Sequence, residues 1–232
     1  MNESLLFLSG LVSVAFVLAA WKLGKERLYS AIIVFLILIA TVGGKIVEFF
    51  GFATNTGNIF YASVFLATYF LIERYGRREG IRSIFIGIVA VVFFSLLARV
   101  TSALIGSGAT AQLDDALSVA FDPLLRLTFA SLLAYAISQS CNVYLYIYLK
   151  ERLQGAHVWL RANVTNVVAQ LLDSTVFFLV AFLGTVPFAS VWEVLLTGFV
   201  IKVVFMMLAS PLLYLNRVEE EDDEGQAIIA IR

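Results

Sequence analysis

Long apolar segments recur along this chain, and several reach or approach the length that crosses a lipid bilayer. A transmembrane helix needs about 20 mostly apolar residues, because the hydrocarbon core is about 30 Å thick and a helix rises about 1.5 Å per residue. The apolar runs cover residues 5–21, 29–50, 59–72, 84–105, 124–149, 159–184 and 191–215. They predict seven spans in an all-α, polytopic membrane helix bundle. Run 59–72 is short enough to be tilted or only partly spanning, which leaves six full spans as the alternative.

The composition agrees with a membrane protein and excludes several other classes. Hydrophobic residues make up 61% of the 232 residues and charged residues only 14%, and the mean hydropathy is +0.93. The sequence contains one cysteine, Cys141, and one histidine, His157, so it offers neither an internal disulfide nor a metal cluster. It also lacks a Walker-type nucleotide-binding motif. We expect no cofactor, no metal and no nucleic-acid partner.

Lysine and arginine are distributed asymmetrically between the connections. The connections after the first, third and fifth runs are basic, whereas those after the second, fourth and sixth have no Lys or Arg apart from Arg126, just inside the fifth run. Because cytoplasmic loops carry the excess of Lys and Arg, this pattern predicts an external N-terminus and a cytoplasmic C-terminus. Residues 219–224 are all acidic. We therefore expect a membrane domain over 1–216 and a solvated, acidic cytoplasmic tail over 217–232.

Four polar side chains interrupt the sixth apolar run at helical spacing. They are Asn163, Asn166, Gln170 and Asp173, at intervals of three, four and three residues. These intervals place all four on one face of a helix. A polar stripe is costly in lipid, so it should face other helices or a cavity, and an intramembrane carboxylate marks a candidate functional site. The stripe predicts a binding site; the alternative is that its amides only join helices by hydrogen bonds.

A second polar stripe lies on the fifth run. Its members follow one another at steps of three and four residues, so they again share one helix face. They are Thr128, Ser131, Tyr135, Ser138 and Asn142, with Gln139 beside them. Aromatic rings on these two runs are candidates to stack on a flat ligand, among them Tyr135, Tyr144, Phe177 and Phe178.

Helix rise predicts that two opposite charges meet inside the membrane. If the sixth helix enters the hydrocarbon near Thr165, Asp173 lies about 12 Å from one side, at about 1.5 Å per residue. The seventh helix runs the other way, which puts Lys202 about 17 Å from the opposite side. In a core of about 30 Å the two residues reach nearly the same depth, where an ion pair would lower the cost of both charges. The pair can be purely structural or part of a ligand or proton pathway.

Four sequence segments occur in a recognisable order. They are FLATYFLIERYG at 65–76, AYAISQSCNVYLY at 134–146, WLRANVTNVVAQLLDSTVFFLVAFLG at 159–184, and Lys202 followed by ASPLLY at 209–214. Together they resemble the queuosine precursor transporter family, also called the vitamin uptake transporter family, over about residues 29–215. The resemblance implies a carrier that imports deazaguanine bases. It also implies a six-helix core made of runs two to seven, with the first run as an extra N-terminal span.

The resemblance also carries over particular site residues. Five polar residues match the family pattern: Ser138, Gln139, Gln170, Asp173 and Lys202. Two positions depart from it, because Tyr69 and Asn142 stand where the family usually has an aspartate.

We therefore expect an integral membrane transporter that imports a small, flat nitrogen heterocycle, a queuosine precursor, through a mid-membrane polar pocket. Asp173 is the expected principal ligand group. The other expected substrate-binding residues are Gln170, Asn166, Asn163, Gln139, Ser138, Asn142, Lys202 and Tyr135. The alternative is a substrate-binding membrane subunit that needs a separate energy-coupling ATPase module. No Ser–His pair occurs at helical spacing, so we do not expect an enzyme, and whether the chain forms a homo-oligomer stays open.

Overall fold

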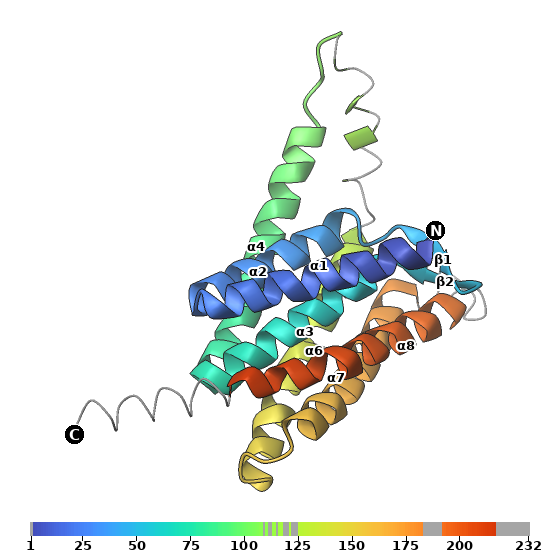
Figure 1. The fold of residues 1–232 in the computed structure, drawn as a ribbon. Helices are drawn as coiled ribbons and strands as arrows, with labels where there is room; N and C mark the ends of the chain where they lie inside the picture. Colours follow the sequence, from blue (N-terminus) through green and yellow to red (C-terminus); the bar gives the residue numbers. More distant parts are fainter. Residues whose placement is uncertain are drawn as a thin grey trace.

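The structure is a computed structural model that describes residues 2–216, apart from 109, 111–112, 115, 118–120, 122–124 and 183–191. The described chain is mostly helical (Figure 1). Its α-helices are α1 (Asn2–Lys22), α2 (Lys25–Thr41), α3 (Gly57–Tyr75), α4 (Arg77–Ser102), α6 (Leu125–Arg152), α7 (Val158–Phe182) and α8 (Trp192–Ala209). A 3-10 helix, η2 (Ser210–Tyr214), continues α8, and two short strands, β1 (Ile46–Phe49) and β2 (Phe52–Asn55), precede α3.

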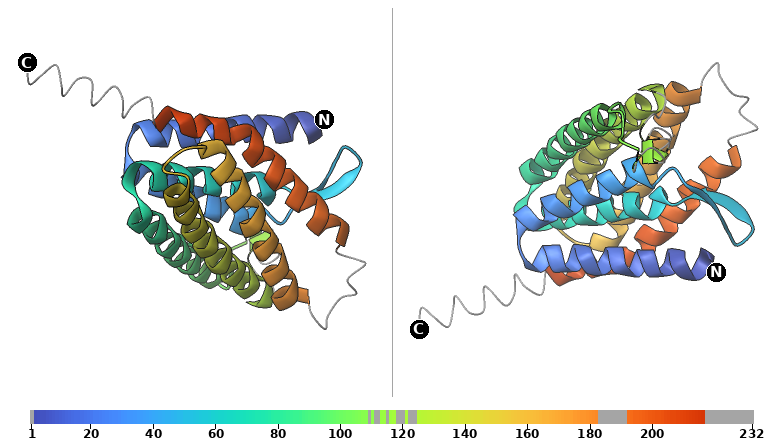
Figure 2. Two further views of the ribbon diagram at one scale, coloured as in Figure 1. Left: turned by 90° about the horizontal axis from the view of Figure 1, so that it is seen from below. Right: turned by 90° about the horizontal axis from the view of Figure 1, so that it is seen from above.

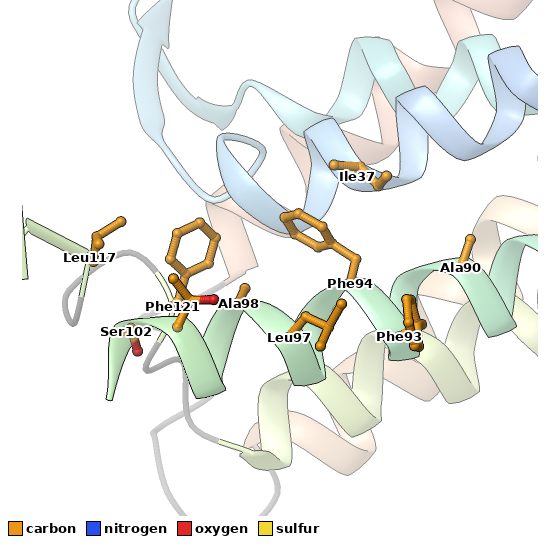
Figure 3. Close-up of a pocket in the computed structure, with 10 residues that line it drawn as sticks. Ile37, Ala90, Phe93, Phe94, Leu97, Ala98, Ser102, Leu117 and Phe121 are labelled. Atoms are coloured by element: carbon orange, nitrogen blue, oxygen red, sulfur yellow. The ribbon is translucent and has the colours of Figure 1, made fainter. Parts of the chain in front are cut away.

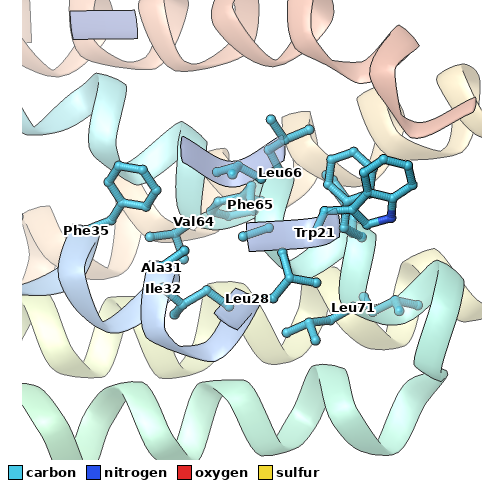
Figure 4. Packing of buried hydrophobic residues seen from close by; sticks show 14 of the residues in the cluster. Trp21, Leu28, Ala31, Ile32, Phe35, Val64, Phe65, Leu66 and Leu71 are labelled. Carbon is cyan, nitrogen blue, oxygen red and sulfur yellow. The ribbon is translucent and has the colours of Figure 1, made fainter. Parts of the chain in front are cut away.

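Helix α3 is the central element of the bundle. Fourteen of its 19 residues are buried, and it packs against α1, α2, α4 and α8 (Figures 1 and 2). A helix that is apolar on nearly all sides is typical of such a position. Phe65 and Leu66 of α3 belong to the same buried cluster as Leu28 and Ile32 of α2 and Trp21 of α1 (Figure 4). This core fixes α3 as the scaffold for the polar side chains described below.

Helices α6 and α7 form an antiparallel pair beside α3, and α4 packs along α6 (Figure 2). The far part of α4 extends beyond the other helices (Figure 1) and exposes large apolar side chains, including Phe93, Leu96 and Val100. An apolar surface of this kind is costly in water and suits contact with lipid. A cavity of about 580 Å³ lies beside this part of α4 and is lined by apolar residues such as Ile37 and Phe121 (Figure 3). The cavity therefore does not include the predicted polar site.

Four stretches are long and apolar enough to cross a membrane by length and composition. They are α1, α4, residues 158–181 of α7, and residues 195–214 from α8 into η2. Helix α2 has only 17 residues, and α3 and α6 carry more polar side chains. Each of the seven predicted runs overlaps a described α-helix, but the expectation of seven full spans stays a prediction.

The second apolar run departs from the all-α expectation. The sequence predicts one helix over 29–50, but α2 ends at Thr41 and the chain continues into an antiparallel β-hairpin. Gly43 and Gly44 follow the helix end, where glycine disfavours further helix. The two-residue turn at Phe50 and Gly51 has positive φ at both positions (50° and 82°), as tight hairpin turns require. The expectation that this whole run is helical is therefore wrong, and Glu48 lies on a strand.

The acidic tail predicted over 217–232 lies outside the described residues, so the boundary between the two predicted parts stays a prediction.

Candidate functional site

Three helices, α3, α6 and α7, enclose a row of polar side chains in the interior of the bundle. Two contacts fix how these helices are aligned. Ser138 of α6 lies level with Asp173 of α7. One turn further along α6, Asn142 meets Tyr69 of α3, which also contacts Thr165 of α7. The two polar stripes predicted on α6 and α7 thus lie against each other.

Asp173 forms an ion pair with Lys202 of α8. Lys202 Nζ lies 3.2 Å from Asp173 Oδ2, and the two side chains are only 8% and 14% exposed. The predicted meeting of these charges is therefore confirmed. A buried pair of this kind lowers the cost of holding each charge away from water.

Tyr61 of α3 completes the surroundings of this ion pair. Its hydroxyl donates to Asp173 Oδ1 over 2.6 Å and lies 3.1 Å from Ser138 Oγ, which is itself 3.4 Å from Asp173 Oδ1. Lys202 Nζ lies 4.9 Å from the centre of the Tyr61 ring, a favourable cation–π distance. Tyr61 was not among the residues predicted from the sequence. The sequence carried little signal for it, because Tyr61 lies in an apolar run and is eight residues from Tyr69, about 80° away around a helix.

Three buried amides lie on α6 and α7, the helices that carry Ser138 and Asp173. Gln139, Asn166 and Gln170 are all fully buried. Gln170 Nε2 donates to Asn166 Oδ1 over 3.4 Å, but three other polar atoms have no partner among the described residues: Gln139 Nε2, Asn166 Nδ2 and Gln170 Oε1. Buried polar atoms without partners are rare in folded proteins and costly. Two N–H donor groups and one acceptor in this group thus lack a hydrogen-bond partner among the described residues.

Tyr69 and Asn142 close this polar region on the side away from Asp173. The Tyr69 hydroxyl donates to Asn142 Oδ1 over 2.7 Å, and it also lies 2.9 Å from Thr165 Oγ1 and 3.0 Å from the carbonyl oxygen of Ala162. Asn142 Nδ2 in turn donates to Gln139 Oε1 over 3.3 Å. The two positions at which the sequence departs from the family pattern are thus in direct contact.

Three other residues predicted from the sequence make no described contact with Asp173. Asn163 Nδ2 donates to Ser210 Oγ over 2.8 Å, so Asn163 joins α7 to η2, and the structure does not bring it to the other amides. Tyr135 is buried, with its ring 6.3 Å from that of Tyr61. Tyr144 is half exposed, and its ring centre lies 4.3 Å from the Arg77 guanidinium; a stacking role for it stays a prediction.

A second buried charge cluster lies beyond Tyr69, toward the start of α7. Arg161 is fully buried, and its Nη2 lies 2.7 Å from Glu73 Oε2, while Lys150 Nζ lies 3.4 Å from the same oxygen. Arg161 Nη1 also donates to the carbonyl oxygens of Gly155 and Ala156 in the α6–α7 connection. This cluster, which sequence reasoning missed, ties together the ends of α3, α6 and α7.

Comparisons with known proteins identify the family. The family described as "Putative vitamin uptake transporter" matches residues 55–216, from β2 to the end of the described chain. The "Probable queuosine precursor transporter" of Bacillus subtilis (strain 168) is 32% identical over 187 residues, which cover 78% of this chain and 79% of that protein. No solved structure was found to match the chain. Both matches are to membrane transporters rather than enzymes. The chain therefore belongs to the vitamin uptake transporter family and is a multi-pass membrane protein.

Proposed function

We propose that this protein imports a small, flat nitrogen heterocycle, a deazaguanine-type queuosine precursor, across the cell membrane. The observation that carries the proposal is the set of fully buried amides with unpaired polar atoms, placed beside a buried Asp173–Lys202 pair. The printed name of the Bacillus subtilis relative supports the choice of solute. An interior of this kind is expensive for a membrane protein unless a guest supplies the missing hydrogen bonds.

The chemistry of the site fits such a base. A deazaguanine ring has an edge with two N–H donor groups, which a carboxylate such as Asp173 accepts well. Its carbonyl and ring nitrogen are acceptors that suit the free N–H groups of Gln139 and Asn166. The rings of Tyr61 and Tyr135 lie close to these groups and can pack against a flat ligand.

Binding requires the polar side chains to rearrange. Asp173 already accepts hydrogen bonds from Tyr61 and Lys202, so a base that binds the carboxylate must displace at least one of them. Lys202 is the better candidate, because the Tyr61 ring can hold its charge after displacement. Access would then alternate between the two sides by rocking of helices around this site.

The membrane orientation is part of the proposal. Basic residues gather where α1 ends, where α2 and α4 begin and where α6 ends, so the positive-inside rule assigns this end of the bundle to the cytoplasm. A reporter enzyme that is active only outside the cytoplasm, fused after Asn216, should be inactive in whole cells. High reporter activity would reverse the orientation.

Uptake by the purified protein tests the function. Proteoliposomes that contain the full chain should accumulate a labelled 7-deazaguanine base faster than protein-free liposomes. Unlabelled base should compete, whereas an unrelated amino acid should not. No uptake and no binding of any deazaguanine base would refute the proposed solute. Binding without uptake, followed by uptake only when an ATPase module is supplied, would instead establish the protein as a binding subunit.

A further inference from the structure

The hydrogen bonds around Tyr69 determine which way a buried amide in the site faces. Tyr69 donates to Asn142 Oδ1, and Asn142 Nδ2 donates to Gln139 Oε1. Each amide has one donor end and one acceptor end, so the bond at one residue fixes the orientation of the next. With its oxygen engaged by Asn142, Gln139 keeps its Nε2 group unpaired and buried.

The position of Gln139 makes this orientation relevant to the solute. On α6, Gln139 lies beside Ser138, which contacts Asp173, and one turn from Asn142, which Tyr69 links to Thr165. It therefore lies level with the part of α7 between Thr165 and Asp173, which includes Asn166 and Gln170, the other two amides with unpaired atoms. A solute that binds Asp173 and extends along α6 toward Asn142 would lie against Gln139.

We propose that Tyr69 is a positioning residue for solute selection. Through Asn142 it holds Gln139 with its N–H groups turned toward the solute, so that the site accepts a ring edge bearing a carbonyl and rejects one bearing an amino group. This inference rests on the proposed function, because it assumes that the solute occupies the site beside Asp173. An amino group facing Gln139 would place donor against donor and leave both unpaired, which is costly in a buried site.

Two matched bases test the inference. 7-Deazaguanine and 2,6-diamino-7-deazapurine have the same ring and the same 2-amino group but carry a carbonyl and an amino group, respectively, at position 6. N1 bears a hydrogen only in 7-deazaguanine, so the contact with Asp173 also favours that base. Binding of both is measured by calorimetry on the purified full chain in nanodiscs. The native protein should bind 7-deazaguanine at least about tenfold more tightly, the effect of one unpaired buried polar group.

Two variants interrupt the connection at different points. Tyr69→Phe removes the hydroxyl, and Asn142→Leu removes the linking amide while Tyr69 keeps Thr165 and Ala162 as partners. Either change frees the Gln139 amide to rotate, so both variants should lower the affinity ratio about tenfold. The part of the ratio that comes from the N1 hydrogen and Asp173 should remain. Tyr146→Phe is the control, because Tyr146 packs on the Tyr69 ring at 4.8 Å but makes no hydrogen bond to Asn142 or Gln139 among the described contacts. Its ratio should stay native, and thermal melting confirms that each variant is folded.

The outcomes separate the inference from the function on which it rests. If the native protein binds neither base, the proposed function fails. If it binds both equally, the function stands and the selection by Gln139 is refuted. A high native ratio that stays unchanged in a folded Tyr69→Phe or Asn142→Leu variant would refute the positioning role of Tyr69.

Discussion

Replacing Asp173 by asparagine should reduce uptake of a 7-deazaguanine base about 10- to 100-fold at low substrate concentration. The expected loss is that of one hydrogen bond to a charged group, about 1.5–3 kcal/mol, at roughly 1.4 kcal/mol per factor of ten. Asparagine has nearly the same shape as aspartate but presents an N–H group in place of one carboxylate oxygen. Initial rates of labelled base uptake into proteoliposomes measure the effect.

This single substitution also leaves Lys202 buried without its partner, and an unpaired buried charge costs about 3–5 kcal/mol. Lower uptake could therefore reflect lower stability. The double variant Asp173→Asn/Lys202→Met separates the two effects, because it removes both charges and should restore the melting temperature. If Asp173 binds the solute, the double variant stays inactive although it is folded. Recovery of native uptake by the double variant would show that the ion pair is only structural.

Much of this site could be predicted from the sequence because helical periodicity and bilayer thickness are strong constraints. The spacing of Asn166, Gln170 and Asp173 placed them on one inward face, and they are found there. Helix rise alone brought Asp173 to the depth of Lys202, and the two are paired at 3.2 Å. Periodicity defines the face of a single helix, so it works best where both partners lie in regular helices.

The parts that could not be predicted depend on packing between helices. Tyr61 lies at a helix position that reads as apolar filling, and only the approach of α3 to α6 and α7 shows that its hydroxyl meets Asp173. Asn163 belongs to the same stripe, but its side chain donates a hydrogen bond to Ser210 at the start of η2. The hairpin after α2 was hidden because its strands are as apolar as the helix before them, and its Phe–Gly turn is not a common hairpin sequence.

The Glu73–Arg161 pair is expected to have a large effect on stability. Arg161 is fully buried and Glu73 is 7% exposed, so Glu73→Gln removes the nearest countercharge from a cation that water cannot reach. The expected loss is about 3–5 kcal/mol in the free energy of unfolding, as for other buried pairs that lose one partner. Lys150 cannot compensate, because it carries the same charge as Arg161. Thermal unfolding of the purified protein in detergent measures the change.

Glu79 provides a matched control. It also lies near two basic residues, Lys25 at 3.8 Å and Arg82 at 4.0 Å, but these partners are 37% and 63% exposed. Glu79→Gln should therefore cost less than about 1 kcal/mol, because exposed ion pairs are screened by water. A loss for Glu73→Gln no larger than that for Glu79→Gln would contradict the view that the cluster holds the ends of α3, α6 and α7 together. Glu79 Oε2 also accepts a hydrogen bond from the Tyr29 hydroxyl, which the oxygen of a glutamine can still accept. The comparison therefore reports mainly the burial of the charged partners.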